Sequence, residues 1–82
     1  MRYLLFVFRH FYPKGGAEDL VGMAMSKEEI VAQFAHGDFD KIGDKYQLRA
    51  NIYDIVGDRI VAHYSDCRWF TPEEYREYRE EY

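Results

Sequence analysis

The turn Tyr12-Pro13-Lys14-Gly15-Gly16 contains the residue types that recognise a small anion. Two consecutive glycines allow positive φ angles, so neighbouring backbone N–H groups can point at one anion. Lys14, with Arg9 shortly before it, would add positive charge, and Tyr12 would offer a ring on which a base can stack. Asp19 could hold the turn or accept a hydrogen bond from a ribose or a base. The predicted site for a nucleotide-like ligand therefore consists of Arg9, Tyr12, Lys14, Gly15, Gly16 and Asp19.

The same turn also has a purely structural interpretation. A Gly-Gly pair closes a β-hairpin without any ligand, and Asp19 would then only cap the turn. One glycine pair is a weak functional signal, so the sequence leaves both roles open.

Aromatic residues form a second candidate surface near the C-terminus. Eight Tyr, six Phe and one Trp make up 18% of the chain, which is more than a small domain readily buries. Tyr and Trp are rigid and amphipathic, which suits them to interfaces. We expect packing inside the domain, or contact with a second copy or a partner, from Trp69, Phe70, Tyr75, Tyr78 and Tyr82.

Groups for catalysis or metal binding are sparse. His63 and Cys67 have the spacing of a ligand pair, but a zinc site usually needs two such pairs. No motif around Cys67 indicates an activated nucleophile. Adjacent carboxylates such as Glu28 and Glu29 point in different directions from a helix, so they do not form an acid–base pair. We expect no enzyme activity, no bound metal and no cofactor.

Length, charge and composition restrict the class of protein. A chain of 82 residues forms one domain, and 48% apolar content excludes intrinsic disorder. The net charge is −4, of which −3 lies in residues 71–82, so no basic face for generic duplex DNA binding is expected. No apolar run is long enough for a membrane span, and no signal peptide is recognised. One cysteine fits a reducing cytoplasm.

The elements that position these residues alternate between strand and helix patterns. Residues 2–12 are apolar on both alternating sets, which predicts a central strand, and residues 17–25 predict an antiparallel partner in which Gly22 marks a bulge or close approach. Ser26 and Glu29 form a capping box for a helix that ends at Gly37. The predicted apolar stripe of this helix comprises Ile30, Val31, Phe34 and Ala35.

The second half of the chain predicts a hairpin and a final helix. In residues 46–52 apolar and polar residues alternate, which predicts a half-buried strand. Residues 55–58 are expected to form a turn, and residues 59–65 a second strand antiparallel to the first, with Ile60, Ala62 and Tyr64 on one side. Thr71 and Glu74 form a second capping box, after which the tyrosines share one helical stripe. The fold prediction is α+β, with a small antiparallel sheet in ββαββα order, one helix packed on a face and a C-terminal helix. Residues 1–70 form the sheet-plus-helix domain, and residues 71–82 form an acidic, Tyr-rich helix within it or at an oligomer contact.

The segment from Phe11 to Gly22 resembles a motif of small phage-encoded proteins of uncharacterised function, Tyr-Pro-x-Gly-Gly-x-x-Asp. A capped helix follows the motif in those proteins, and a strand pair around an Asp-x-x-x-Gly turn is similar to residues 51–61 here. Phe11 replaces a Tyr of their motif, and the Glu-Tyr-Arg tail lies outside the pattern. The resemblance implies a viral origin, hence a host cytoplasm, and assigns no activity.

Two functions remain open by analogy with other phage proteins of this size. The first is a non-enzymatic binding protein that counteracts a host anti-phage defence process by sequestering a small anionic, nucleotide-like ligand, enclosed by a homo-oligomer. The alternative is a protein–protein inhibitor that docks its acidic, Tyr-rich surface on a host enzyme or nucleic-acid-binding protein.

Overall fold

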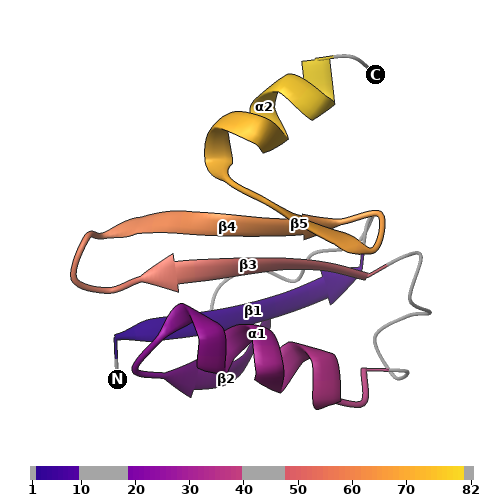
Figure 1. The fold of residues 1–82 in the computed structure, drawn as a ribbon. Helices are drawn as coiled ribbons and strands as arrows, with labels where there is room; N and C mark the ends of the chain where they lie inside the picture. Colours follow the sequence, from indigo (N-terminus) through magenta and orange to yellow (C-terminus); the bar gives the residue numbers. More distant parts are fainter. Residues whose placement is uncertain (1, 10–18, 40–47, 81–82) are drawn as a thin grey trace.

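A single five-stranded antiparallel sheet with two helices forms the domain in the computed structural model, which describes residues 2–9, 19–39 and 48–80 (Figure 1). The strand order is β2-β1-β3-β4-β5. The predicted α+β class, antiparallel sheet and C-terminal helix are confirmed. The elements are β1 (Tyr3–Arg9), β2 (Leu20–Ala24), α1 (Lys27–His36), β3 (Leu48–Asp54), β4 (Arg59–Ser65), β5 (Arg68–Phe70) and α2 (Pro72–Glu80). No helix of these described residues is long and apolar enough to cross a membrane.

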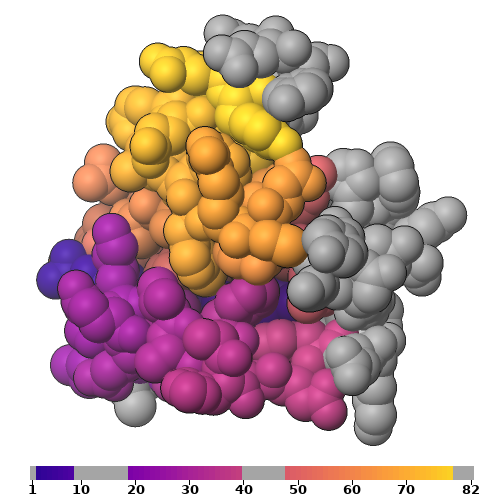
Figure 2. All heavy atoms as spheres, turned by 45° about the vertical axis from the view of Figure 1, so that its right-hand side comes forward, coloured from indigo at the N-terminus to yellow at the C-terminus, as the bar shows by residue number. Residues whose placement is uncertain are grey.

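The two helices pack on opposite faces of the sheet. Phe34 of α1 contacts Tyr64 and Trp69, which are paired across β4 and β5 and so share one face. His63 pairs with Phe70 on the other face, where the rings of α2 lie over them. Figure 2 shows the atoms of α1 in purple to magenta along the lower part of the molecule and those of α2 in yellow above. The sheet therefore separates the two helices.

The hydrophobic core lies between α1 and its face of the sheet. β3 alternates strictly between buried and half-buried residues, as its sequence pattern predicts. Ile30 is the only buried residue of α1, and it has no exposed surface. Val31 and Ala35 of the predicted stripe are exposed, because the short helix touches the sheet along a narrow line. The buried core cluster comprises Leu5, Val7, Ala24, Ile30, Leu48, Ala50, Ile52 and Ala62.

A β-bulge in β4 changes which of its side chains face the core. Ile52 pairs with Ala62 but Tyr53 pairs with Ile60, so Val61 is the extra residue on its strand. Val61 packs against the core cluster, and Ile60 lies on the opposite face with Tyr53. The prediction that Ile60 shares a face with Ala62 and Tyr64 is therefore wrong.

β2 is an edge strand of the sheet, and α1 packs over it. Leu5 pairs with Gly22 but Phe6 pairs with Leu20, so β2 has a β-bulge directly before Gly22, as predicted. A Cβ on Gly22 would also clash with Oε1 of Gln33.

The Gln33 side-chain amide donates to the backbone carbonyl of Met23 at 3.0 Å. The next carbonyl, that of Ala24, accepts from the backbone N–H of Arg2 at 3.1 Å. Because successive carbonyls of a strand point to opposite sides, the Met23 carbonyl faces the outer edge.

Both predicted capping boxes begin helices. Ser26 Oγ accepts from the Glu29 N–H at 3.2 Å. Thr71 and Glu74 bond reciprocally, with each backbone N–H donating to the other side chain, at 2.9 and 3.2 Å. Gly37 ends α1 as predicted, but its φ of −77° needs no glycine. A Cβ there would lie 2.5 Å from the Phe39 ring, so the position requires space and not a left-handed backbone.

The three-residue strand β5 was not predicted from the sequence; a two-residue turn joins it to β4. Asp66 and Cys67 in this turn have φ angles of 50° and 66°. Two left-handed residues of this kind are typical of a type I′ turn, for which Asp-Gly is a preferred sequence. Asp tolerates this conformation, whereas the Cβ of Cys67 makes it costly.

Replacing Cys67 by glycine should therefore stabilise the protein. The expected gain is about 1 kcal/mol, equivalent to a rise in Tm of about 4–8 °C for a domain of this size. Thermal unfolding followed by circular dichroism measures it. Cys67→Ala is the matched control, because it removes the sulfur that interacts with Tyr64 but keeps the Cβ. Equal Tm values for the two variants would contradict relief of backbone strain as the cause.

Candidate functional site

Most of the predicted anion site lies outside the described residues. This applies to Tyr12, Lys14, Gly15 and Gly16. Arg9 ends β1, where its backbone pairs with Leu48. Asp19 lies directly before β2 and is buried, at 7% exposure. The role of the Gly-Gly turn thus remains a prediction.

The predicted C-terminal aromatic surface is divided between the two faces of the sheet. Trp69 contacts Phe34 and Tyr64 on the α1 face. Phe70 is buried on the other face, with the Tyr78 ring centroid at 4.9 Å and the Tyr75 ring at 5.8 Å. Tyr82 lies outside the described residues. The described members of this group make contacts within the domain, and a role of these residues toward a partner remains a prediction.

Polar contacts attach α2 to the sheet. The Tyr75 ring stacks on His63 at 4.4 Å between centroids, and its hydroxyl accepts from Arg49 Nη1 at 3.1 Å. His63 Nδ1 lies 2.8 Å from Asn51 Oδ1. His63 thus faces α2 while Cys67 lies in the turn after β4. Across residues 2–9, 19–39 and 48–80 no group of three His, Cys, Asp or Glu side chains could hold a metal.

A groove that we term the cationic groove runs along the first half of β4. β5 pairs only with His63–Ser65, so among the described residues no strand lies beside the preceding part of β4 on that side. The groove has a volume of about 410 Å³ and also receives the beginnings of both helices. Its lining consists of Tyr3, Lys27, Arg59, Ile60, Val61, Thr71, Pro72 and Glu73.

Lys27 and Arg59 give this groove two positive charges. Within the described part of the chain, neither side chain forms a hydrogen bond or an ion pair. Both residues are exposed. The first residues of α1 and α2, Lys27 and Pro72, lie at the positive ends of the two helix dipoles. These features favour a negatively charged ligand, with Glu73 as the one carboxylate in the lining.

Arg2, which precedes the groove residue Tyr3 in sequence, is paired with a carboxylate. Its Nε and Nη2 donate to the two carboxylate oxygens of Asp54 at 3.0 and 3.1 Å. The hydrogen bonds from Arg2 hold the pKa of Asp54 below its usual value, assisted by backbone N–H groups of Val56 and Gly57. The guanidinium also lies 5.1 Å from the centre of the Tyr3 ring. Lys27 and Arg59 are therefore the cations available to a ligand.

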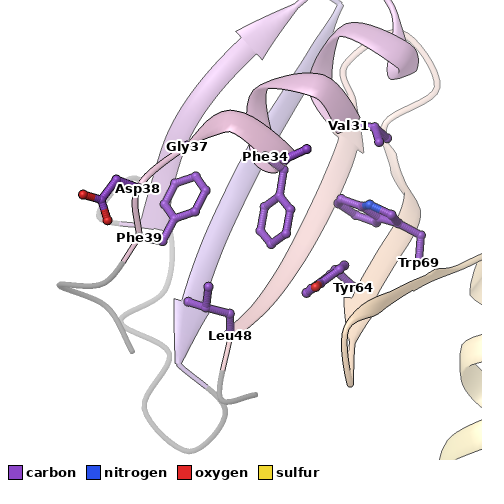
Figure 3. A pocket seen from close by; sticks show the side chains of 9 residues that line it. Val31, Phe34, Gly37, Asp38, Phe39, Leu48, Tyr64 and Trp69 are labelled. Atoms are coloured by element: carbon purple, nitrogen blue, oxygen red, sulfur yellow. The ribbon is translucent and has the colours of Figure 1, made fainter. Parts of the chain in front are cut away.

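A second groove, the aromatic groove, opens between the C-terminal half of α1 and the β4–β5 hairpin. It has a volume of about 350 Å³. Figure 3 shows Phe34 pointing into it between Phe39 on one side and Tyr64 and Trp69 on the other. Burial, together with Cys67, raises the pKa of the Tyr64 phenol, which is thus neutral at pH 7. The lining of the aromatic groove consists of Val31, Phe34, Ala35, Gly37, Asp38, Phe39, Leu48, Tyr64 and Trp69.

Neither Lys27 nor Arg59 was predicted as a site residue from the sequence. One signal was present: Lys27 occupies the first position of a helix, where the dipole favours acidic residues. Arg59 gives no local signal, because it follows an ordinary turn. The groove that both residues line lies beside the part of β4 that the short β5 leaves uncovered, and β5 was not predicted from the sequence.

Comparison with known proteins identifies one family. The family model described as Bacteriophage T4 protein Y07C matches residues 3–64, from the start of β1 to the penultimate residue of β4. The match ends before β5 and α2. Searches of curated proteins and of solved structures found no significant match.

Proposed function

We propose that this chain, which belongs to the bacteriophage T4 protein Y07C family, is a non-enzymatic binding protein that sequesters a small anionic, nucleotide-like ligand and thereby counteracts a host anti-phage process. One observation carries the proposal. Lys27 and Arg59 line the same groove, and neither forms an ion pair within the described residues of a chain whose net charge is −4. Such cations are the usual partners of phosphate.

The chemistry of the cationic groove favours a nucleotide over a simple anion. Arg59 can bind a phosphate through two parallel hydrogen bonds, and Lys27 can add a point charge. Thr71 offers a hydroxyl, and Glu73 can accept from a ribose hydroxyl or a base amine. A ligand that has a phosphate at one end and donor groups at the other satisfies both kinds of side chain.

Sequestration fits this groove better than turnover. A hydrolytic enzyme needs a positioned general base or an activated nucleophile next to the bound phosphate. Among the described residues that line the groove there is neither a His nor a Cys, and Glu73, their one carboxylate, is exposed. The protein would therefore act by lowering the concentration of free ligand.

A nucleotide panel tests this function by thermal shift. We expect at least one mono-, di- or cyclic nucleotide to raise the Tm, since a ligand that binds only the folded state stabilises it. Arg59→Gln should weaken binding by at least about tenfold, because it removes both charged hydrogen bonds to the phosphate and each is worth about 1.5 kcal/mol or more. Lys27→Gln should act similarly. Arg76→Gln is the matched control, because Arg76 is exposed on α2 and outside both grooves.

Two results would contradict different parts of the proposal. A panel in which no nucleotide changes the Tm would contradict sequestration, and equal binding by Arg59→Gln and Arg76→Gln would contradict the cationic groove as the binding site. Lys14→Gln separates the cationic groove from the Gly-Gly turn. If only this variant loses the ligand, sequestration stands and the binding site is the turn.

Inhibition of a host protein is the second candidate, and the exposed acids of α2 favour it. Glu73, Glu74 and Glu77 are exposed, while Tyr75 and Tyr78 are turned toward the sheet. The acidic side of α2 could therefore dock on a basic host surface without disturbing the tyrosine contacts. Glu73→Gln with Glu77→Gln should weaken such docking and leave α2 packed on the sheet.

A further inference from the structure

On the basis of the function proposed above, we propose that Tyr75 is a positioning residue for the cationic groove, and that ligand binding in this groove is coupled to docking of α2 on the sheet. Thr71, Pro72 and Glu73 supply one side of the groove from the start of α2, whereas its other described lining residues come from β1, α1 and β4. The side that α2 supplies lies beyond residue 64, where the match to the phage family model ends. The position of α2 therefore decides whether the groove has both of its sides.

Few contacts hold α2 on the sheet. None of its described side chains, at positions 72–78, is buried. Two tyrosine rings reach the sheet: Tyr78 lies 4.9 Å from Phe70 and Tyr75 lies 4.4 Å from His63, measured between ring centroids. Figure 1 shows α2 rising away from β4 toward its C-terminal end. Tyr75 follows Glu73 within one helical turn, so the position of Tyr75 sets the position of the groove side that α2 supplies.

Two contacts of different kinds fix Tyr75. Its ring is nearly parallel to that of His63, with 17° between the planes, and its hydroxyl accepts from Arg49 Nη1 at 3.1 Å. His63 Nδ1 in turn lies 2.8 Å from Asn51 Oδ1. The stacking sets the height of the ring above the sheet, and the hydrogen bond sets its place along the sheet. Together they hold the first turn of α2 against β3 and β4.

Coupling follows because a nucleotide would contact both sides of the groove. A ligand with its phosphate on Arg59 and its ribose or base on Glu73 binds only the arrangement in which α2 is docked. Binding then stabilises the docked helix, and docking strengthens binding by the same factor. Inorganic phosphate can be held by the cations alone, without α2. A substitution of Tyr75, which does not line the groove, should therefore weaken nucleotide binding and spare phosphate binding.

Two substitutions of Tyr75 grade the effect. Tyr75→Phe keeps the ring and loses the contact with Arg49, and Tyr75→Leu also loses the stack on His63. The probes are inorganic phosphate and the nucleotides AMP, ADP, cyclic AMP and their guanine counterparts, titrated into the full-length protein by NMR at constant pH. For a nucleotide that binds the wild type, affinity should fall about threefold in Tyr75→Phe and about tenfold in Tyr75→Leu, because fewer molecules have α2 docked. The affinity for phosphate should change by less than about twofold.

The His63 ring protons measure docking itself, because the stacked Tyr75 ring shifts their resonances. In Tyr75→Phe these resonances should leave their wild-type positions, and saturation with the nucleotide should return them most of the way. Arg49→Gln should weaken nucleotide binding as much as Tyr75→Phe, and the double variant no further, because both remove the same hydrogen bond. Tyr64→Phe is the matched control, since Tyr64 lies on the α1 face and outside the cationic groove.

The Trp69 indole N–H resonance shows whether each variant is folded, and if Tyr75→Leu does not fold, Tyr75→Phe and Arg49→Gln provide the test. Three results would overturn the coupling and leave sequestration standing. They are equal nucleotide affinity in the wild type and the Tyr75 variants, an equal loss of phosphate and nucleotide affinity, and His63 resonances in Tyr75→Phe that the nucleotide does not return. If none of the nucleotides binds the wild type, the proposed function fails and the coupling fails with it.

Discussion

Replacing Ile30 by alanine should lower the free energy of unfolding by about 3 kcal/mol. Ile30 has no exposed surface and is the only buried residue of α1. The change removes three carbon atoms from a site enclosed by the sheet, and the cost of such truncations is about 2–5 kcal/mol. Since domains of this size have little stability in reserve, a large fraction of the molecules should unfold at moderate temperature. Urea unfolding followed by circular dichroism measures the change.

The adjacent Val31 provides a control for this prediction. It is 37% exposed on the same helix, so Val31→Ala should cost well under 1 kcal/mol. Similar losses from the two substitutions would contradict Ile30 as the principal attachment of α1 to the sheet.

Replacing Asp54 by alanine should lower the Tm by about 10 °C, and this is the second substitution for which we expect a large loss of stability. Asp54 is 5% exposed and accepts two hydrogen bonds from Arg2 and one from the Val56 N–H. It therefore ties the start of β1 to the end of β3 and shapes the turn that follows. Alanine leaves both donors without their partner, which costs more than the loss of an exposed ion pair. Differential scanning calorimetry measures the Tm.

The contribution of Asp54 should also depend on pH. Because its folded-state pKa lies below the usual value, its ionised form stabilises the protein fully above the ordinary carboxyl pKa of about 3.9. This stabilisation is lost as the pH falls through the lowered pKa of the folded state. From pH 5 to pH 2 the wild type should therefore lose more stability than Asp54→Asn, which has no such proton to take up. Glu77→Gln, at an exposed position on α2, should follow the wild type, and parallel curves for wild type and Asp54→Asn would contradict the prediction.

The elements that local sequence specifies were predictable. Capping residues such as Ser26 and Thr71 act within one helical turn, so their pattern reveals both helix starts. The alternation in β3 likewise reflects one buried face. The bulge at Val61 has no local signature, because it depends on the register between β3 and β4. β5 has three residues, which is too short for a periodic pattern.

The candidate sites were harder to predict than the fold. Each groove combines residues that are distant in sequence, as Lys27 and Arg59 are, and their meeting depends on tertiary packing. The aromatic residues Trp69 and Phe70 were recognised as important, but neighbouring residues of a strand point to opposite faces. One therefore lies in the aromatic groove and the other beneath α2.

The hydrogen bond from Gln33 to the Met23 carbonyl bears on how this protein avoids aggregation. An edge strand with free outward-facing carbonyls can serve as a template for strands of other molecules. On β2 the side chain of Gln33 occupies one of these acceptors, at 3.0 Å, and α1 overhangs the strand. This matters because Val21 and Met23 are 43% and 51% exposed on the same strand. The Gln33 amide thus makes one outward-facing acceptor of this apolar edge unavailable to a strand of another molecule.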